Sequence, residues 1–289
     1  MCINRSIADA MDVALEKRPP WSVDINEPGA AERAATSLTI NGFCALRGPI
    51  VPADMCERCA AAVYGRLDTL LHAASSRGLD VDAGLLRFNE VCKRHHAARY
   101  DLRLPLGRAT ALVPQDAASV EGAQSWIDIK PLVDMVVQPI VSRAFDEENA
   151  PQDDWAADAW STEVAGCVVS LPGASVQASH ADGTSPALVN AFVPLVAVDA
   201  RNGTEIQPGS HLDTHGMPTD ALAPLPHGVV PSLDAGDLLL FHYRAVHRGL
   251  ANASASARPV LYFTYGADGA VDTHNFPTDE PLLNERGSA

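Results

Sequence analysis

The second half of the chain is a series of short apolar runs divided by turn-forming clusters, and this pattern restricts the fold more than any other feature. The runs read EVAGCVVSL, ALVNAFVPLVAVD, DLLLFHYRAV and RPVLYFTYG, and the clusters between them include LPGAS, DARNGTE, QPGSH, DAGD and ANASASA. Short β-branched and aromatic runs bounded by Gly, Pro, Asn and Asp are typical of antiparallel β architectures. We therefore expect residues 160–266 to form an antiparallel barrel or a jelly roll.

The first half of the chain favours helices. Residues 53–77 are rich in Ala, Leu and Arg and carry an apolar stripe at helical spacing, and residues 127–145 give a second helical region. A chain of 289 residues with 47% hydrophobic content is ample for one core. We expect a single domain that is mainly β with flanking α-helices. Residues 1–160 would pack on the β core, and residues 267–289 would form a C-terminal tail.

The charge and the ends of the chain indicate the compartment and the partners. The formal net charge is −15, and such a surface repels the phosphate backbone of nucleic acids. No apolar run approaches the ~20 residues that a bilayer span needs, and the N-terminal segment lacks the continuous apolar stretch of a signal peptide. We expect a cytoplasmic protein without a nucleic-acid or membrane partner, and the pattern leaves its oligomeric state open.

The segment QASHADGTSP follows the first apolar run and holds His180 and Asp182. Residues i and i+2 of an extended strand point to the same face, so this spacing directs an imidazole and a carboxylate toward one point. A surface turn also produces such pairs, so a functional site at His180 and Asp182 requires a third residue that completes it. His247, after GDLLLFHYRAV, is the candidate, and we assign its competitor His242 to the core or to the surroundings of the site.

Two imidazoles and one carboxylate on one face of a metal leave open coordination positions. Non-haem Fe(II) oxygenases use this arrangement, and a zinc hydrolase can use the same ligands. Arg258 begins the last apolar run, eleven residues after His247. Its planar, permanently charged fork suits a co-substrate with a terminal carboxylate, and this favours the oxygenase.

At these motifs the chain resembles the phytanoyl-CoA dioxygenase family of Fe(II)/2-oxoglutarate oxygenases. The resemblance is carried by QASHAD, NGTEIQPGSH, GDLLLFHYRAVHRG and RPVLYFTY, and it covers roughly residues 160–266. It implies a double-stranded β-helix core, which is the cupin-like form of the jelly roll. It also implies that Fe(II), 2-oxoglutarate and O2 oxidise a C–H bond of a small-molecule substrate with release of succinate and CO2.

The resemblance also implies roles for individual residues. His180, Asp182 and His247 fall on the iron positions of the family, and Arg258 falls on the arginine that pairs with the distal carboxylate of 2-oxoglutarate. Related halogenases replace the aspartate with Ala or Gly, so the presence of Asp182 disfavours halogenation.

Two further positions and one departure concern the co-substrate. Gln177 lies where the family often has a polar residue beside 2-oxoglutarate, and Thr204 resembles a position that often lines that pocket. Many members carry Ser or Thr two residues after the second histidine, whereas this chain has Gly249. The compensating group could be Thr204, Tyr262, or a tyrosine or arginine from the N-terminal half.

The segment CKRHHAARYDLRLPL, residues 92–106, is dense in hydrogen-bond donors. It is either a solvated basic face or a source of groups at the mouth of the active site, with Arg99, Tyr100 and Arg103 as candidates. We expect an enzyme that hydroxylates, or otherwise oxidises, a small molecule. The alternatives are a non-catalytic jelly-roll sensor and a cupin-type hydrolase or isomerase that does not use 2-oxoglutarate.

Overall fold

The computed structural model describes residues 19–82, 85–93, 98–110, 113–145, 160–212, 222, 225–267, 270, 272 and 280–283. The elements are β1 (Ser22–Asp24), α2 (Ala30–Asn41), β2 (Phe43–Arg47), α3 (Ala53–Ser76), β3 (Leu86–Arg87), β4 (Val91–Lys93), β5 (Arg99–Arg103), η1 (Ala117–Ser119), α4 (Gln124–Ile127), α5 (Lys130–Phe145), β6 (Trp160–Ser170), β7 (Leu188–Pro194), β8 (Thr204–Ile206), η2 (Ser210–Leu212), β9 (Leu238–His242), β10 (His247–Gly249) and β11 (Arg258–Ala267).

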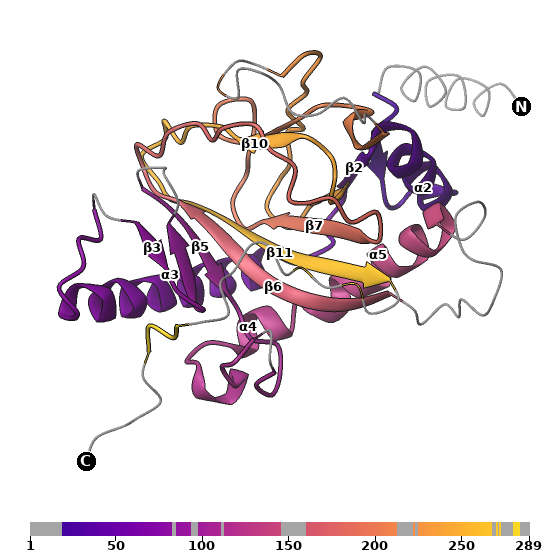
Figure 1. The fold of residues 1–289 in the computed structure, drawn as a ribbon. Coiled ribbons are helices and arrows are strands. Elements are labelled where there is room, and N and C mark those ends of the chain that lie inside the picture. The colour runs from indigo at the N-terminus through magenta and orange to yellow at the C-terminus, as the bar shows by residue number, and fades with distance from the viewer. Residues whose placement is uncertain are drawn as a thin grey trace, which may run out of the picture.

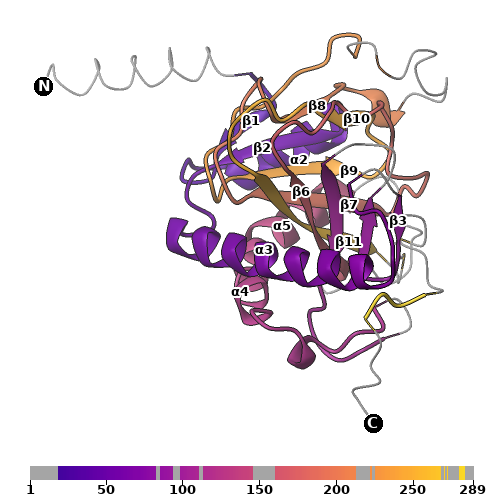
Figure 2. The ribbon, with the colours of Figure 1, turned by 90° about the vertical axis from the view of Figure 1, so that its left-hand side faces the viewer.

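The strands form one large sheet and one small sheet. The large sheet has the order β1-β2-β9-β7-β11-β6-β5-β4-β3, and the small sheet pairs β10 with β8. Single bridges, His180 to His247 and Ile206 to Val229, add two more segments to the small sheet. The result is the predicted mainly β jelly roll. Figures 1 and 2 show α3, α4 and α5 on one side of the large sheet, with β10 on the other side.

Strand β11 shows why the large sheet has two different faces. Side chains of a strand alternate between the faces, and alternate residues of β11 belong to the helix-covered hydrophobic core: Leu261, Phe263 and Tyr265. The intervening residues line a cavity between the sheets: Arg258, Val260, Tyr262 and Thr264. The sheet therefore separates a dry structural core from a polar pocket.

The N-terminal half contributes strands as well as helices. The predicted helices correspond to α3 and α5, but β2 pairs with β9 and β5 pairs with β6 inside the large sheet. The sequence prediction did not include these strands. Strand β2 is buried on both faces, so its sequence, FCALR, lacks the polar–apolar alternation that identifies a half-exposed strand.

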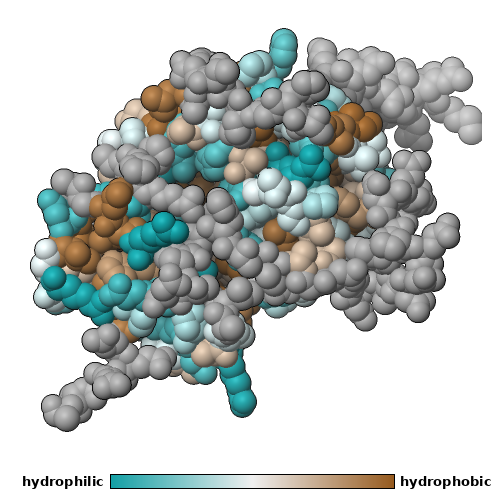
Figure 3. Space-filling model, viewed as in Figure 1, coloured by the Kyte–Doolittle hydropathy of each residue, from teal (hydrophilic) through white to brown (hydrophobic). Residues whose placement is uncertain are grey.

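The helices of the described residues are too short or too polar to cross a bilayer. Figure 3 shows hydrophilic and hydrophobic residues interspersed on the face seen in Figure 1.

Gly236 fixes the approach to β9. Its N–H donates to the carbonyl of Pro194, and its own carbonyl accepts from Val51, so it joins two distant segments. Its φ is +86°, and a Cβ on this residue would overlap the carbonyl oxygen of Val51. Gly173 has nearly the same φ, +83°, but a Cβ there meets nothing within 4 Å.

We therefore expect Gly236→Ala to destabilise the protein more than Gly173→Ala. Both substitutions force an L-residue into the left-handed region, at a cost of about 1–2 kcal/mol. Only Gly236→Ala adds the steric overlap, which should cost about 1–3 kcal/mol more. Urea unfolding of the two variants measures the difference. Equal losses of stability would show that the Val51 contact relaxes freely.

Candidate metal centre and its pocket

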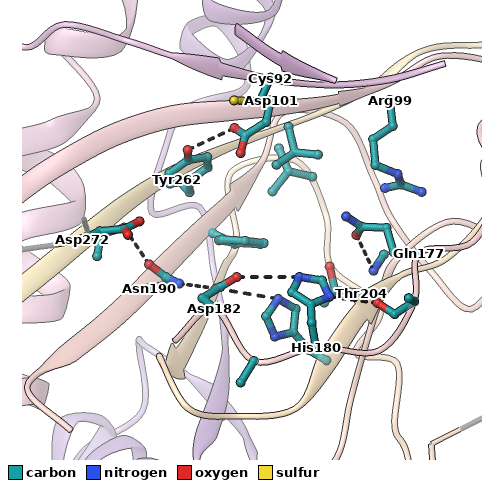
Figure 4. A pocket seen from close by; sticks show the side chains of 18 of the residues that line it. Cys92, Arg99, Asp101, Gln177, His180, Asp182, Asn190, Thr204, Tyr262 and Asp272 are labelled. Carbon is teal, nitrogen blue, oxygen red and sulfur yellow. Dashed lines mark hydrogen bonds and ion pairs between the residues drawn. The ribbon is translucent and has the colours of Figure 1, made fainter. Parts of the chain in front are cut away.

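His180, Asp182 and His247 meet in the cavity between the two sheets. One ligating atom from each lies within 4.8 Å of the other two. Nε2 of His180 is 3.7 Å from Oδ1 of Asp182, and Nε2 of His247 is 3.8 Å from Oδ2. Figure 4 shows His180 beside the carboxylate of Asp182. The sequence spacing predicted this meeting of three residues.

Backbone hydrogen bonds bring the three residues together. The N–H of His180 donates to the carbonyl of His247 at 2.9 Å, and the N–H of His247 donates to the carbonyl of His180 at 2.8 Å. The N–H of Asp182 donates to the carbonyl of Tyr243 at 3.1 Å. Both histidine-bearing segments are therefore fixed to each other through the main chain.

The same segments also fix the orientation of both rings. Nδ1 of His180 lies 2.9 Å from the carbonyl oxygen of Ala178, and Nδ1 of His247 lies 3.0 Å from that of Ala245. A carbonyl oxygen only accepts, so each Nδ1 carries the hydrogen. The lone pair of each Nε2 is then directed toward the carboxylate, as metal-binding histidines require.

Arg258 is buried at the start of β11 and is 3% exposed. Its Nη1 donates to the carbonyls of Asn202 and Gly203, and its Nη2 donates to Oγ of Ser170 at 2.8 Å. A guanidinium has five N–H donors. Two donors, the N–H of Nε and one N–H of Nη2, therefore remain for a group in the pocket, and among the described residues Nε has no partner.

Arg99 is a second buried guanidinium in the same pocket. Ser170 of β6 is the register partner of both Arg99 on β5 and Arg258 on β11, so the two arginines lie on either side of it. Nη2 of Arg99 donates to two carbonyls, those of Ser175 at 2.9 Å and Leu250 at 2.7 Å. Its Nε and Nη1 have no partner within the part of the chain that the structure describes.

Burying these two cations together is unfavourable without an anion. Burial lowers the pKa of Arg99 to about 9, and the nearby charge of Arg258 adds to this effect. Burial likewise lowers the pKa of Arg258 to about 10. Among the described residues no carboxylate forms an ion pair with either side chain. A small carboxylate would offset the cost and use the remaining N–H donors.

Arg99 occupies the space that a side chain at Gly249 would need. A Cβ on Gly249 would lie 2.5 Å from Nη1 of Arg99 and 2.5 Å from Oε1 of Gln177. Oε1 of Gln177 accepts from the N–H of Gly249 at 2.8 Å. Thr204 is the register partner of Gly249 across β8 and β10. Gln177 and Thr204, two of the residues predicted to bind the co-substrate, therefore lie beside this glycine, and Arg99 fills the remaining space next to it.

The pocket has a volume of about 300 Å³ and extends beyond the triad. Figure 4 shows Arg99, Gln177 and Thr204 on one side of the triad, and Tyr262, Asp101 and Asp272 on the other. The hydroxyl of Tyr262 donates to Oδ1 of Asp101 at 3.0 Å. Burial and the two nearby carboxylates hold the pKa of Tyr262 well above its usual range, so the hydroxyl stays a donor.

Gly166 makes the contact between Tyr262 and Asp101 possible. Gly166 lies on β6, between β11 and β5, and it is the register partner of Tyr262. A Cβ at this position would overlap the ring end of Tyr262. The phenol therefore crosses β6 over a residue that has no side chain, and this end of the cavity gains a polar wall.

All six residues proposed from the sequence line this one cavity: His180, Asp182, His247, Arg258, Gln177 and Thr204. Of the donor-rich segment, Arg99 reaches the pocket, whereas Tyr100 belongs to the helix-covered core. Arg103 does not line the pocket, but it is buried near Tyr262, Asp272 and Asp101 and is not on a solvated face. Sequence reasoning missed Asn190 and Asp101. For Asn190 the only signal was one amide inside the apolar run LVNAFVP.

His242 lies outside the triad. Its Nδ1 accepts from the N–H of Arg244 at 3.1 Å, and its ring packs 5.3 Å from that of His211 and 6.0 Å from that of Phe145. Burial, with the charges of His211 and Arg244, lowers its pKa to about 3. His242 is a neutral core residue beside the site, as the sequence indicated.

The family model for phytanoyl-CoA dioxygenase matches residues 39–260. The epimerase SnoN, solved with Fe3+, alpha-ketoglutarate and nogalamycin RO, is 18% identical with a TM-score of 0.53, over 91% of this chain and 93% of SnoN. AviO1 from Streptomyces viridochromogenes Tue57 is 19% identical with a TM-score of 0.55, over 83% of this chain and 96% of AviO1.

HygX from Streptomyces hygroscopicus, solved with nickel and 2-oxoglutarate, is 10% identical with a TM-score of 0.50, over 83% of this chain and 88% of HygX. Because all three identities are below 25%, these structures show that the fold is shared and no more than that.

The buried, neutral His242 predicts a pH dependence of stability. The unfolded chain takes up a proton on this residue below about pH 6.5, whereas the folded protein does so only near pH 3. Stability should therefore fall as the pH drops through this window, by up to about 1.4 kcal/mol per pH unit. In His242→Asn, whose amide oxygen can still accept from Arg244, this part of the loss should vanish. Urea unfolding of metal-free protein from pH 7 to 4 measures it, and parallel curves for the two proteins would contradict the assignment.

Proposed function

The chain belongs to the phytanoyl-CoA dioxygenase family, and from this premise we propose that it hydroxylates a small-molecule substrate. It is a non-haem iron enzyme that depends on 2-oxoglutarate and O2. When bound, iron, 2-oxoglutarate and O2 supply the oxidation of a C–H bond, with release of succinate and CO2. The observation that carries the proposal is one cavity lined by the His180–Asp182–His247 triad and two buried guanidiniums.

The triad fits Fe(II) by the chemistry of its donors. Two neutral imidazole nitrogens and one carboxylate oxygen form the ligand set of non-haem Fe(II) oxygenases. His180 and His247 keep their Nε2 lone pairs available because each Nδ1–H is bonded to a backbone carbonyl. We assign these two residues and Asp182 as the iron ligands, which leaves the remaining positions for the co-substrate and O2.

The paired guanidiniums fit 2-oxoglutarate, because their orphaned N–H groups need an anion. Arg258 would bind the distal carboxylate with its two remaining donors, and Arg99 would bind the same group with Nε and Nη1. Gln177 and Thr204 flank that position. In this assignment Arg99 replaces the hydroxyl that many family members carry at the position of Gly249.

The opposite end of the cavity would hold the substrate. Val168 and Phe192 give it an apolar wall, and Asp101, Tyr262 and Asp272 give it a polar edge. Carboxylates accept hydrogen bonds and attract cations. We therefore expect a small substrate with an apolar body and hydroxyl or amino groups.

Hydroxylation is the outcome that we propose, although related folds also support others. SnoN is described as an epimerase. A screen of small metabolites by succinate release would find the substrate, and mass spectrometry of the product would identify the reaction. A product heavier by one oxygen atom supports hydroxylation. An unchanged mass would favour epimerisation, and loss of two hydrogens would favour desaturation or ring closure.

We predict that His180→Ala, Asp182→Ala and His247→Ala each abolish iron binding and turnover together, because each removes one of three protein ligands. Iron content and succinate formation are measured on the same samples. Anaerobic wild-type protein with Fe(II) should develop a weak visible absorption band only after 2-oxoglutarate is added, and the three variants should not.

His242→Asn is the matched control, because it alters a neighbouring histidine that is not a ligand. It should keep both iron and the absorption band. Retention of near-native iron by His247→Ala would overturn the ligand assignment. Iron binding without any band in the wild type would favour a metal hydrolase or isomerase.

We predict that Arg258→Ala and Arg99→Ala each raise the apparent KM for 2-oxoglutarate by about tenfold to several hundredfold. Each loses charge-assisted hydrogen bonds worth roughly 1.5–3 kcal/mol. Arg258→Lys should recover only part of the affinity, because an ammonium does not match a planar carboxylate. A 2-oxoglutarate titration of succinate formation measures the effect, with iron content unchanged.

A rescue variant tests the exchange between Arg99 and Gly249. Gly249→Ser alone should be harmful, because the new side chain overlaps Arg99. In the double variant Arg99→Ala/Gly249→Ser the overlap with Arg99 is removed and only the flexible end of Gln177 has to shift, so the serine should restore part of the affinity lost in Arg99→Ala. An unchanged KM in Arg99→Ala would remove this residue from the co-substrate site and leave the role of Arg258 to its own test.

A further inference from the structure

Asp182 is the one member of the triad whose orientation depends on side chains instead of backbone carbonyls. Oδ2 of Asp182 accepts a hydrogen bond from Nδ2 of Asn190 at 2.6 Å. Oδ1 of Asn190 accepts from the hydroxyl of Thr264 at 2.7 Å. Asn190 is 3% exposed and Thr264 is 1% exposed. Figure 4 shows Asn190 next to Asp182, on the side away from Thr204.

The sheet register places these residues side by side. Thr264 on β11 and Asn190 on β7 are directly opposite each other. Both occupy pocket-facing positions of their strands and line the cavity. Directly opposed residues of antiparallel strands have their Cβ atoms about 4.5–5.5 Å apart, a distance that one short hydrogen bond between side chains can span.

The chemistry of the three groups gives the hydrogen bonds one direction. An ionised carboxylate only accepts, so the amide nitrogen of Asn190, and not its oxygen, must face Asp182. The amide oxygen then faces Thr264 and also only accepts, so the threonine hydroxyl must donate. Rotating the amide by half a turn would place its oxygen against the carboxylate, and both groups only accept. The carboxylate therefore sets the direction of the amide, and the Thr264 hydroxyl holds the amide in place through its oxygen.

We propose that Asn190, oriented by Thr264, is a positioning residue that restricts Asp182 to binding the metal through one oxygen, Oδ1. This inference rests on the proposed iron site. The bond to Asn190 engages Oδ2 and prevents rotation of the carboxylate. Without it, Asp182 can turn and present both oxygens to the metal. The second oxygen would then compete with 2-oxoglutarate for a position at the metal.

The test uses Co(II) and 2-oxoglutarate binding, without turnover. Metal-free protein is titrated with Co(II) and followed by its visible absorption, and the Co(II)-loaded protein is then titrated with 2-oxoglutarate. Asn190→Leu should weaken Co(II) binding by about 10–100-fold, as expected for loss of an outer partner of a ligand. It should also weaken 2-oxoglutarate binding, although Arg258 and Arg99 are intact.

Thr264→Val and Thr264→Ser form the matched pair. Valine keeps the shape of threonine and removes the hydroxyl, so Co(II) binding should weaken in the same direction as in Asn190→Leu. Serine keeps the hydroxyl and should bind Co(II) within a fewfold of the wild type. A purely structural role would change thermal unfolding of the metal-free protein without separating the pair in metal binding.

The results distinguish this inference from the proposed function. If the wild type binds Co(II) no better than Asp182→Ala, the iron site itself is wrongly assigned. If the wild type binds Co(II) and Asp182→Ala does not, but Asn190→Leu and Thr264→Val bind like the wild type, the positioning role is wrong. Should Asn190→Leu fail to fold, the Thr264 pair decides alone.

Discussion

The two reciprocal backbone hydrogen bonds between His180 and His247 are the contact on which the site depends. They join segments that are far apart in the sequence, and they add the His180 segment to the small sheet. Main-chain bonds of this kind do not depend on the identity of the side chains. The two rings therefore meet because the jelly roll closes, and their carbonyl partners, two residues back in each segment, then set the tautomers.

Much of the site could be predicted from the sequence, because its residues follow local rules. The rule that two residues separated by one on a strand share a face led to His180 and Asp182, although in the structure His180 forms an isolated bridge and Asp182 lies in a bend. The arginine at the start of the last apolar run lies eleven residues after His247, at the beginning of the next strand of the chain. The jelly roll itself followed from the apolar runs and the turn clusters between them.

The rest could not be predicted, because it depends on contacts between distant strands. Strand β5 lies in a segment with mixed composition, and only its pairing with β6 places Arg99 opposite Ser170. Gly249 gave the complementary signal, a missing hydroxyl, but the sequence offered several groups to replace it. Asn190 could be read only as an isolated polar residue in an apolar strand, and its partner Thr264 is assigned by register alone.

The alternation along β11 also has a consequence for folding. A slip of one residue in its pairing would turn Arg258 and Thr264 into the helix-covered core and expose Leu261 and Phe263 to the pocket. Burying a guanidinium there without a partner is far more costly than losing one apolar contact. The polar residues of the site thus also disfavour a shifted pairing of β11. A variant that neutralises Arg258 loses part of its protection against mispairing as well as an anion-binding group.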